Sequence, residues 1–181
     1  MRARSSVFIA TSLDGFIARE NGGLDWLDDA NATVPDGEDC GYSAFMASVD
    51  VLIMGRKTYE KVLTFGEWPY GETRVVVMSR SQISFPEKIP STVSHSSESP
   101  TALHERLSKE GVKQLYIDGG ITIQRFLAEG LIDEFTVTVI PIILGKGIPL
   151  FGQSEREILL NHIETKSFEF GFVQSKYSVI K

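Results

Sequence analysis

Short apolar runs alternate with segments of helical spacing along residues 5–140. The apolar runs predict strands at about 5–11, 51–54, 73–79 and 115–118, with a short extended piece near 92–94. Helical spacing predicts helices at 39–48, 58–63, 100–110 and 121–129. Between the first strand and the first helix, residues 14–36 are rich in Gly, Asn and Asp, and we expect a long loop there.

The last part of the chain has a different pattern. Residues 132–140 alternate as a strand, in which Phe135, Val137 and Val139 oppose threonines. In residues 159–180, phenylalanines alternate with polar or small residues, which predicts two closing antiparallel strands. Alternating strands and helices followed by antiparallel strands predict an α/β fold with a mostly parallel sheet, in a single domain over residues 1–181.

Composition limits the classes of partner. The formal net charge of −6 provides no general attraction to nucleic acid or to anionic membranes. No run approaches the ~20 apolar residues of a membrane span. The single cysteine, Cys40, cannot form an intrachain disulfide, and we expect a cytoplasmic protein. The three histidines are scattered without metal-ligand spacing, so we expect no metal site.

Three strand ends carry groups that suit phosphate. A glycine followed by a basic pair and a threonine opens one helix, a serine and an arginine follow another strand, and two glycines precede a third helix. These groups are Gly55, Arg56, Lys57 and Thr58; Ser79 and Arg80; and Gly119, Gly120, Ile121 and Thr122. Free backbone N–H groups and cations at such ends can bind anions, although ordinary strand–helix turns with solvated arginines would look the same.

Together, the three ends predict one crevice for one long, multiply charged ligand. Two arginines suit a terminal 2′-phosphate, so we expect NADPH rather than NADH. The paired glycines would let a pyrophosphate lie across the start of the third helix. We also predict that the peptide bond between Gly119 and Gly120 is cis.

The order and spacing of these blocks resemble dihydrofolate reductases, most specifically in the Met-Gly-Arg-Lys-Thr run at residues 54–58. The later Leu-Ile-Asp-Glu and Pro-Ile-Ile-Leu-Gly runs, at 131–134 and 141–145, are more similar to the reductase domain of bacterial riboflavin biosynthesis. The resemblance covers about residues 5–152. It implies a dihydrofolate reductase-like three-layer fold with a mixed sheet of about eight strands. It also implies NADPH as cofactor and hydride transfer to a C=N or C=O bond of a small heterocycle.

The resemblance also implies roles for individual residues. Ala10 and Ile17 would line the nicotinamide pocket, and Trp26, Asp39 and Thr138 would face the substrate. Asp39 and Asp14 are the candidates for hydrogen bonding or proton relay. Asp39 could equally be an acidic residue that only stabilises the start of a helix. A homodimer is expected by the same analogy.

Several functions remain open from the sequence. The blocks that hold the ribose phosphate in the riboflavin reductases are missing, because Trp26 is followed by Leu27-Asp28-Asp29 and Thr58 by Tyr59-Glu60-Lys61. We expect a stand-alone NADPH-dependent reductase, similar to 5-amino-6-(5-phosphoribosylamino)uracil reductase in type. The alternatives are a genuine dihydrofolate reductase and a non-catalytic protein that senses NADPH.

Overall fold

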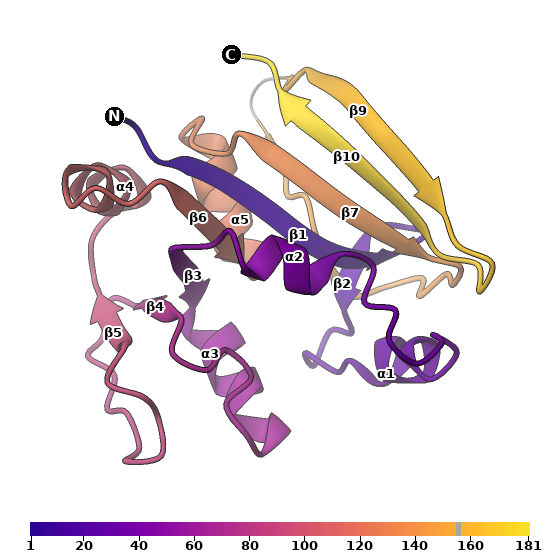
Figure 1. Ribbon diagram of the computed structural model, residues 1–181, viewed down its shortest axis with the longest axis horizontal. Helices are drawn as coiled ribbons and strands as arrows, with labels where there is room; N and C mark the ends of the chain where they lie inside the picture. Colours follow the sequence, from indigo (N-terminus) through magenta and orange to yellow (C-terminus); the bar gives the residue numbers. More distant parts are fainter. Residues whose placement is uncertain (155–156) are drawn as a thin grey trace.

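The computed structural model describes residues 1–154 and 157–181 and is built around one eight-stranded sheet (Figure 1). From edge to edge, the strands are β5 (Val93–Ser96), β4 (Arg74–Met78), β3 (Val51–Gly55), β6 (Gln114–Asp118), β1 (Arg4–Ser12), β7 (Glu134–Ile140), β10 (Val173–Val179) and β9 (Leu160–Ser167). The strands from β5 to β7 are parallel to their neighbours, whereas β10 is antiparallel to both β7 and β9. The expected mixed, mostly parallel sheet with antiparallel C-terminal strands is confirmed.

The strand order creates a crossover point beside β6. The chain moves outward from β3 to β5, and then returns to place β6 between β3 and β1. Because these strands are parallel, the carboxyl ends of β4, β3, β6 and β1 meet at one edge of the sheet. Open α/β sheets bind ligands at such an edge, next to the crossover.

Helices cover both faces of the sheet. On one face, α2 (Tyr42–Met46) and α3 (Arg56–Val62) pack on a core that includes Leu52, Met54 and Tyr116. On the other face, α4 (Pro100–Lys109) and α5 (Gly120–Ala128) pack on a core that includes Val51 and Ile53. Consecutive β3 residues therefore serve opposite cores, since strand side chains alternate between faces. The result is a three-layer fold.

The expected continuous loop over residues 14–36 is wrong. This segment contains β2 (Phe16–Ala18) and α1 (Asp25–Asn31), and β2 pairs with β8 (Ile148–Pro149). Such short strands have no room for a visible alternation, and their pairing joins distant parts of the chain. Trp26 anchors α1 in a third core cluster with Phe168 and Phe172.

The helix expected over 39–48 is shorter than predicted. It begins only at Tyr42, because Gly41 has φ 83° and Cys40 has φ 53°, which a right-handed helix cannot include. A short 3₁₀ turn, Leu63–Phe65, follows α3. Among the described helices, none has both the length and the apolar character that crossing a membrane requires.

Both ends of the chain are fixed near the start of β7. Asp133 accepts hydrogen bonds from the Arg2 guanidinium at 2.7 Å and from the backbone N–H of Ser5 at 2.8 Å. The ammonium group of Lys181 pairs with the same carboxylate. These contacts hold the first and last strands in register with β7.

Candidate functional site

The two glycine-containing corners of the predicted crevice lie against each other at the carboxyl edge of the sheet. A Cβ atom at Gly55 would lie 2.8 Å from the Thr122 hydroxyl oxygen. A Cβ atom at Gly119 would lie within 3.0 Å of the Thr58 hydroxyl oxygen. The starts of α3 and α5 can therefore approach this closely only because both positions are glycine.

Gly120 brings a further segment to this edge. A Cβ atom there would lie 3.1 Å from Ile17 of β2 and 3.3 Å from Ile148 of β8. The small β2–β8 sheet therefore packs directly on the start of α5. The structure thus brings Ile17, Gly55, Thr58, Gly119, Gly120 and Thr122 together.

The N-terminus of α5 is available to an anion. Gly119 precedes the helix and no side chain caps it, and its first turn contains no acidic residue. The first N–H groups of a helix have no partner within the helix, and its dipole favours negative charge there. Ile121, in this turn, is 63% exposed, which is unusual for an isoleucine and leaves it free to contact a ligand.

The prediction of a cis bond between Gly119 and Gly120 is wrong, because that peptide bond is trans. Gly119 instead turns the chain through φ 89° and ψ 136°. Only glycine adopts this conformation readily, so the close approach to α3 needs no cis bond.

The predicted cations lie next to this edge. Gly55 of β3 pairs in register with Met78 of β4, so Arg56 and Ser79 leave neighbouring strands at the same level. Arg56 is held by Glu60, with 2.7 Å between Nε and the carboxylate oxygen. Lys57 and Arg80 are exposed and have no ion-pair partner among the described residues. The Ser79 hydroxyl accepts a hydrogen bond from the Ser81 N–H at 3.2 Å.

A partly buried carboxyl group lies beside the same edge. Asp118 ends β6, immediately before the paired glycines, and one of its oxygens accepts a hydrogen bond from the Gly119 N–H at 2.8 Å. The other oxygen has no hydrogen-bond partner among the described residues. Burial raises the pKa of Asp118 to about 6, against a smaller lowering by the Gly119 bond. Sequence reasoning gave Asp118 no role, although its place directly before two glycines at a strand end was visible.

Aromatic residues of the second core cluster lie near this carboxyl group. Phe8, on the strand next to β6, stacks on Phe45 of α2 at 5.0 Å, and Phe45 meets the ring of Tyr116 edge-on at 5.0 Å. Burial, together with the negative charge of Asp118, raises the pKa of Tyr42 to about 12. Burial followed by the same charge also raises the pKa of Tyr70 and Tyr116. The hydroxyls therefore stay neutral and can act as hydrogen-bond donors.

The carboxylates of Asp14 and Asp39 are engaged in local hydrogen bonds. Asp14 accepts from the Ser12 hydroxyl at 2.6 Å and from the N–H groups of Leu144 and Gly145 at 3.1 and 2.7 Å. The Ser12 bond is the main cause of a lowered pKa for Asp14. Asp14 therefore joins the β1–β2 turn to the loop that follows β7.

Asp39 makes equivalent contacts at the start of α2. Its oxygens accept from the N–H groups of Gly41 at 2.9 Å and Ser43 at 2.8 Å. Hydrogen bonding by Ser43 is the main reason that its pKa is lowered. This is how an acidic residue stabilises a helix start.

The remaining predicted site residues lie in or beside the third core cluster. Trp26 is buried there with Ile140, and Ala10 packs against that cluster. The hydroxyl of Thr138 accepts a hydrogen bond at 2.9 Å from Gln174, whose amide also donates to the Cys40 carbonyl at 3.0 Å. Within the described chain, Thr138 is thus already paired with a protein side chain. Over residues 1–154 and 157–181, no group of three or more His, Cys, Asp or Glu could hold a metal ion.

Comparison with known proteins places this architecture in a family. The chain is 41% identical to YwjB of Bacillus subtilis (strain 168) over 172 residues, covering 93% of this chain and 94% of YwjB. A protein of Shewanella sp. PV-4, assigned by name to riboflavin biosynthesis, superposes with a TM-score of 0.91 at 40% identity, covering 100% of both chains.

Dihydrofolate reductase of Enterococcus faecalis, solved with NADP(H), superposes with a TM-score of 0.66 at 14% identity, covering 100% of this chain and 99% of that one, which shows a shared fold. A profile of the RibD C-terminal domain family matches residues 6–173. The chain therefore belongs to the RibD C-terminal domain family.

Proposed function

We propose that this protein is an NADPH-dependent reductase that transfers a hydride to a C=N or C=O bond of a small heterocyclic substrate. The observation that supports the proposal is the contact between Gly119 and Thr58, with that between Gly55 and Thr122, which brings the two helix starts proposed to bind phosphate against each other. Family membership supports a RibD-like reductase. The fold shared with a dihydrofolate reductase solved with NADP(H) supports the choice of cofactor.

The residues present fit this cofactor. A Cβ atom at Gly55 or Gly119 would collide with a threonine of the facing helix, so the glycines let the starts of α3 and α5 lie side by side, where one long anion could reach both. The uncapped start of α5 would bind the pyrophosphate, and Arg56, Lys57, Ser79 and Arg80 would hold the 2′-phosphate end. Ile17 would contact the nicotinamide side. When bound, NADPH supplies a hydride at this edge.

We further propose that Asp118 supplies the proton that accompanies the hydride. Reduction of C=N or C=O requires a proton on the nitrogen or oxygen. A carboxyl group with a pKa near its working pH is a suitable donor. Tyr42 and Tyr70, whose hydroxyls remain protonated, would orient a planar heterocycle beside Asp118. Solvent would restore the proton on Asp118.

The test is a screen of NADPH oxidation with pterins, flavins, quinones and ribosylaminopyrimidines. We expect turnover with at least one planar heterocycle and a decline in kcat as the pH rises through about 6, because Asp118 must be protonated. Asp118→Asn should lower kcat by about 10²- to 10⁴-fold and remove that decline, with little change in the affinity for NADPH. Tight NADPH binding without turnover on any substrate would instead support the sensor.

A genuine dihydrofolate reductase is less well supported. In the resemblance, Asp39 and Thr138 would bind the pterin, yet Asp39 bonds to the start of α2 and Thr138 to Gln174. Methotrexate-sensitive reduction of dihydrofolate would favour that enzyme, and inactivity on dihydrofolate would exclude it.

A further inference from the structure

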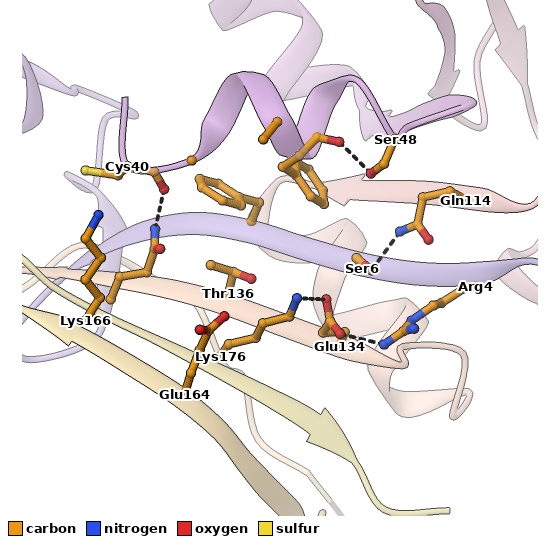
Figure 2. A pocket seen from close by; sticks show the side chains of 15 residues that line it. Arg4, Ser6, Cys40, Ser48, Gln114, Glu134, Thr136, Glu164, Lys166 and Lys176 are labelled. Atoms are coloured by element: carbon orange, nitrogen blue, oxygen red, sulfur yellow. Dashed lines mark hydrogen bonds and ion pairs between the residues drawn. The ribbon is translucent and has the colours of Figure 1, made fainter. Parts of the chain in front are cut away.

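A polar groove lies on the α2 face of the sheet (Figure 2). It has a volume of about 440 Å³, within the range of small-molecule pockets. The register aligns Phe8, Thr136, Lys176 and Glu164 in one row across four strands, which form its floor. Beside Phe45, the segment around α2 borders the groove with the small residues Cys40, Gly41, Ala44 and Ser48.

Phe8 and Phe45 form an aromatic wall of the groove, and neither Asp118 nor the paired glycines line it. Phe8 and Phe45 line the groove, and their stacked rings are 5.0 Å apart. Tyr116, which lies with Asp118 on β6, meets the Phe45 ring edge-on and does not line the groove. The groove is therefore distinct from the proposed site of reduction.

Part of the charge in the groove is neutralised internally. Glu134 pairs with Arg4 at 2.5 Å through one oxygen and with Lys176 at 3.1 Å through the other (Figure 2). Glu164 and Lys166, by contrast, form no ion pair with any described residue. The ammonium group of Lys166 lies 4.3 Å from the centre of the Phe168 ring, which holds it at one end of the groove.

The two unpaired charges have a fixed spacing. Glu164 and Lys166 are two residues apart on β9 and therefore project from the same face, about 7 Å apart along the strand. Between them and the aromatic wall, the hydroxyl of Thr136 and the amide oxygen of Gln174 have no hydrogen-bond partner among the described residues. The groove thus offers one anion, one cation, neutral polar groups and an aromatic surface.

We propose that this groove is a second small-molecule site, for an amino-acid-like zwitterion with an apolar or aromatic body. The ammonium group of the ligand would pair with Glu164 and its carboxylate with Lys166, while its body would pack on Phe8 and Phe45. Each ionic contact to one end of the ligand is charge-assisted, so both charges are needed for full affinity. This site does not depend on the proposed reductase activity.

The test uses three related probes: L-phenylalanine, phenylacetate and phenethylamine, titrated into ¹⁵N-labelled protein. We expect saturable shifts of the Gly41, Ala44 and Thr136 amide signals with L-phenylalanine. Each single-charge probe should bind about tenfold more weakly, the effect of losing one charge-assisted contact. An absence of saturable shifts at these amides with millimolar L-phenylalanine, or equal binding of the three probes, would overturn the proposal.

Two variants test which charged end of the ligand each of the side chains Glu164 and Lys166 binds. Lys166→Gln should weaken the binding of L-phenylalanine and phenylacetate about tenfold and leave that of phenethylamine unchanged. Glu164→Gln should weaken the binding of L-phenylalanine and phenethylamine about tenfold and leave that of phenylacetate unchanged. Lys109→Gln, on α4 at the opposite face, is the matched control and should change none of them. If the groove variants bind all probes like the control, the zwitterion assignment is wrong. Titration of the same samples with NADPH reports on the reductase site separately.

Discussion

At the scale of single residues, Gly119 is the position in the candidate site where a side chain would be tolerated least. It has φ 89°, and any Cβ atom would collide with the Thr58 hydroxyl. We expect Gly119→Ala to lower the free energy of unfolding by about 1–3 kcal/mol, from backbone strain and the collision together. It should also weaken NADPH binding, since the start of α5 must shift. Chemical unfolding and an NADPH titration measure both effects.

Gly37→Ala is the matched control for this change. Gly37 has φ 84°, close to that of Gly119, but no atom lies within 4 Å of the position that a Cβ would take there. The control should show the backbone strain alone and leave NADPH affinity unchanged. Thr58→Ala in the Gly119→Ala background should recover part of the stability. Equal losses in the free energy of unfolding for Gly37→Ala and Gly119→Ala would show that the starts of α3 and α5 do not meet as described.

His104 makes a pH-dependent contribution to stability because it is buried beneath the first residues of the chain. It is buried on α4, and its Nε2 lies 3.0 Å from the Ala3 carbonyl oxygen. Burial is the main cause of its lowered pKa. The unfolded chain therefore takes up a proton at a higher pH than the folded chain, and stability falls as the pH drops below the unfolded pKa of about 6.5.

We expect the wild-type protein to lose more stability than His104→Gln between pH 7.5 and pH 5.5. Thermal unfolding at the two pH values measures the difference. A parallel decline in both proteins would show that His104 does not remain neutral in the folded state.

At the scale of elements, the hydrogen bonds at the start of α2 indicate a structural role for Asp39, whereas Asp118 is the proposed proton donor. Asp39 bonds to the Gly41 and Ser43 N–H groups, and an asparagine can keep one of these bonds. We expect Asp39→Asn to leave kcat nearly unchanged, in contrast to Asp118→Asn, and Asp39→Ala to lower stability modestly. Steady-state kinetics of the variants decide the matter. A loss of turnover in Asp39→Asn comparable to that in Asp118→Asn would return the catalytic role to Asp39.

Elements with a clear apolar period were predictable from the sequence. Leu103 and Leu107 identified α4, and the β7 alternation placed Phe135 in the core. β2 and β8 were not predictable, because their pairing depends on contacts between residues more than a hundred positions apart. The glycines and threonines at these strand ends were singled out from the sequence, and the structure brings them together. The role proposed for Asp118 was hidden, because its raised pKa arises from desolvation, which depends on how the whole chain packs around it.

At the scale of the whole molecule, we propose that the α5 face of the C-terminal strands forms a homodimer interface. A groove of about 730 Å³ lies between α5 and β9, and its described lining carries no charged side chain. Apolar residues project beside it, among them Phe151 at 50% and Leu159 at 63% exposure. In a two-fold dimer the same surface of both copies meets, so the exposed apolar side chains of each copy could enter the groove of the other. The zwitterion groove, on the α2 face, would stay open.

We therefore expect Leu160→Glu, in this groove, to shift the protein towards a monomer, since a charge would be buried in an apolar contact. Lys109→Glu on α4 serves as a control that should leave the mass unchanged. Light scattering after size-exclusion chromatography gives the mass directly. A wild-type protein that is monomeric at all accessible concentrations would contradict the proposed interface.

The central claim, that separate corners of the sheet edge form one site for a 2′-phosphorylated nicotinamide dinucleotide, is tested most directly by calorimetric titration with NADPH and NADH. We predict saturable binding of NADPH, weaker binding of NADH, and an Arg80→Ala variant whose affinity falls about tenfold or more for NADPH and little for NADH. No detectable binding of NADPH, or an equal fall in affinity for NADPH and NADH in the Arg80→Ala variant, would contradict this claim.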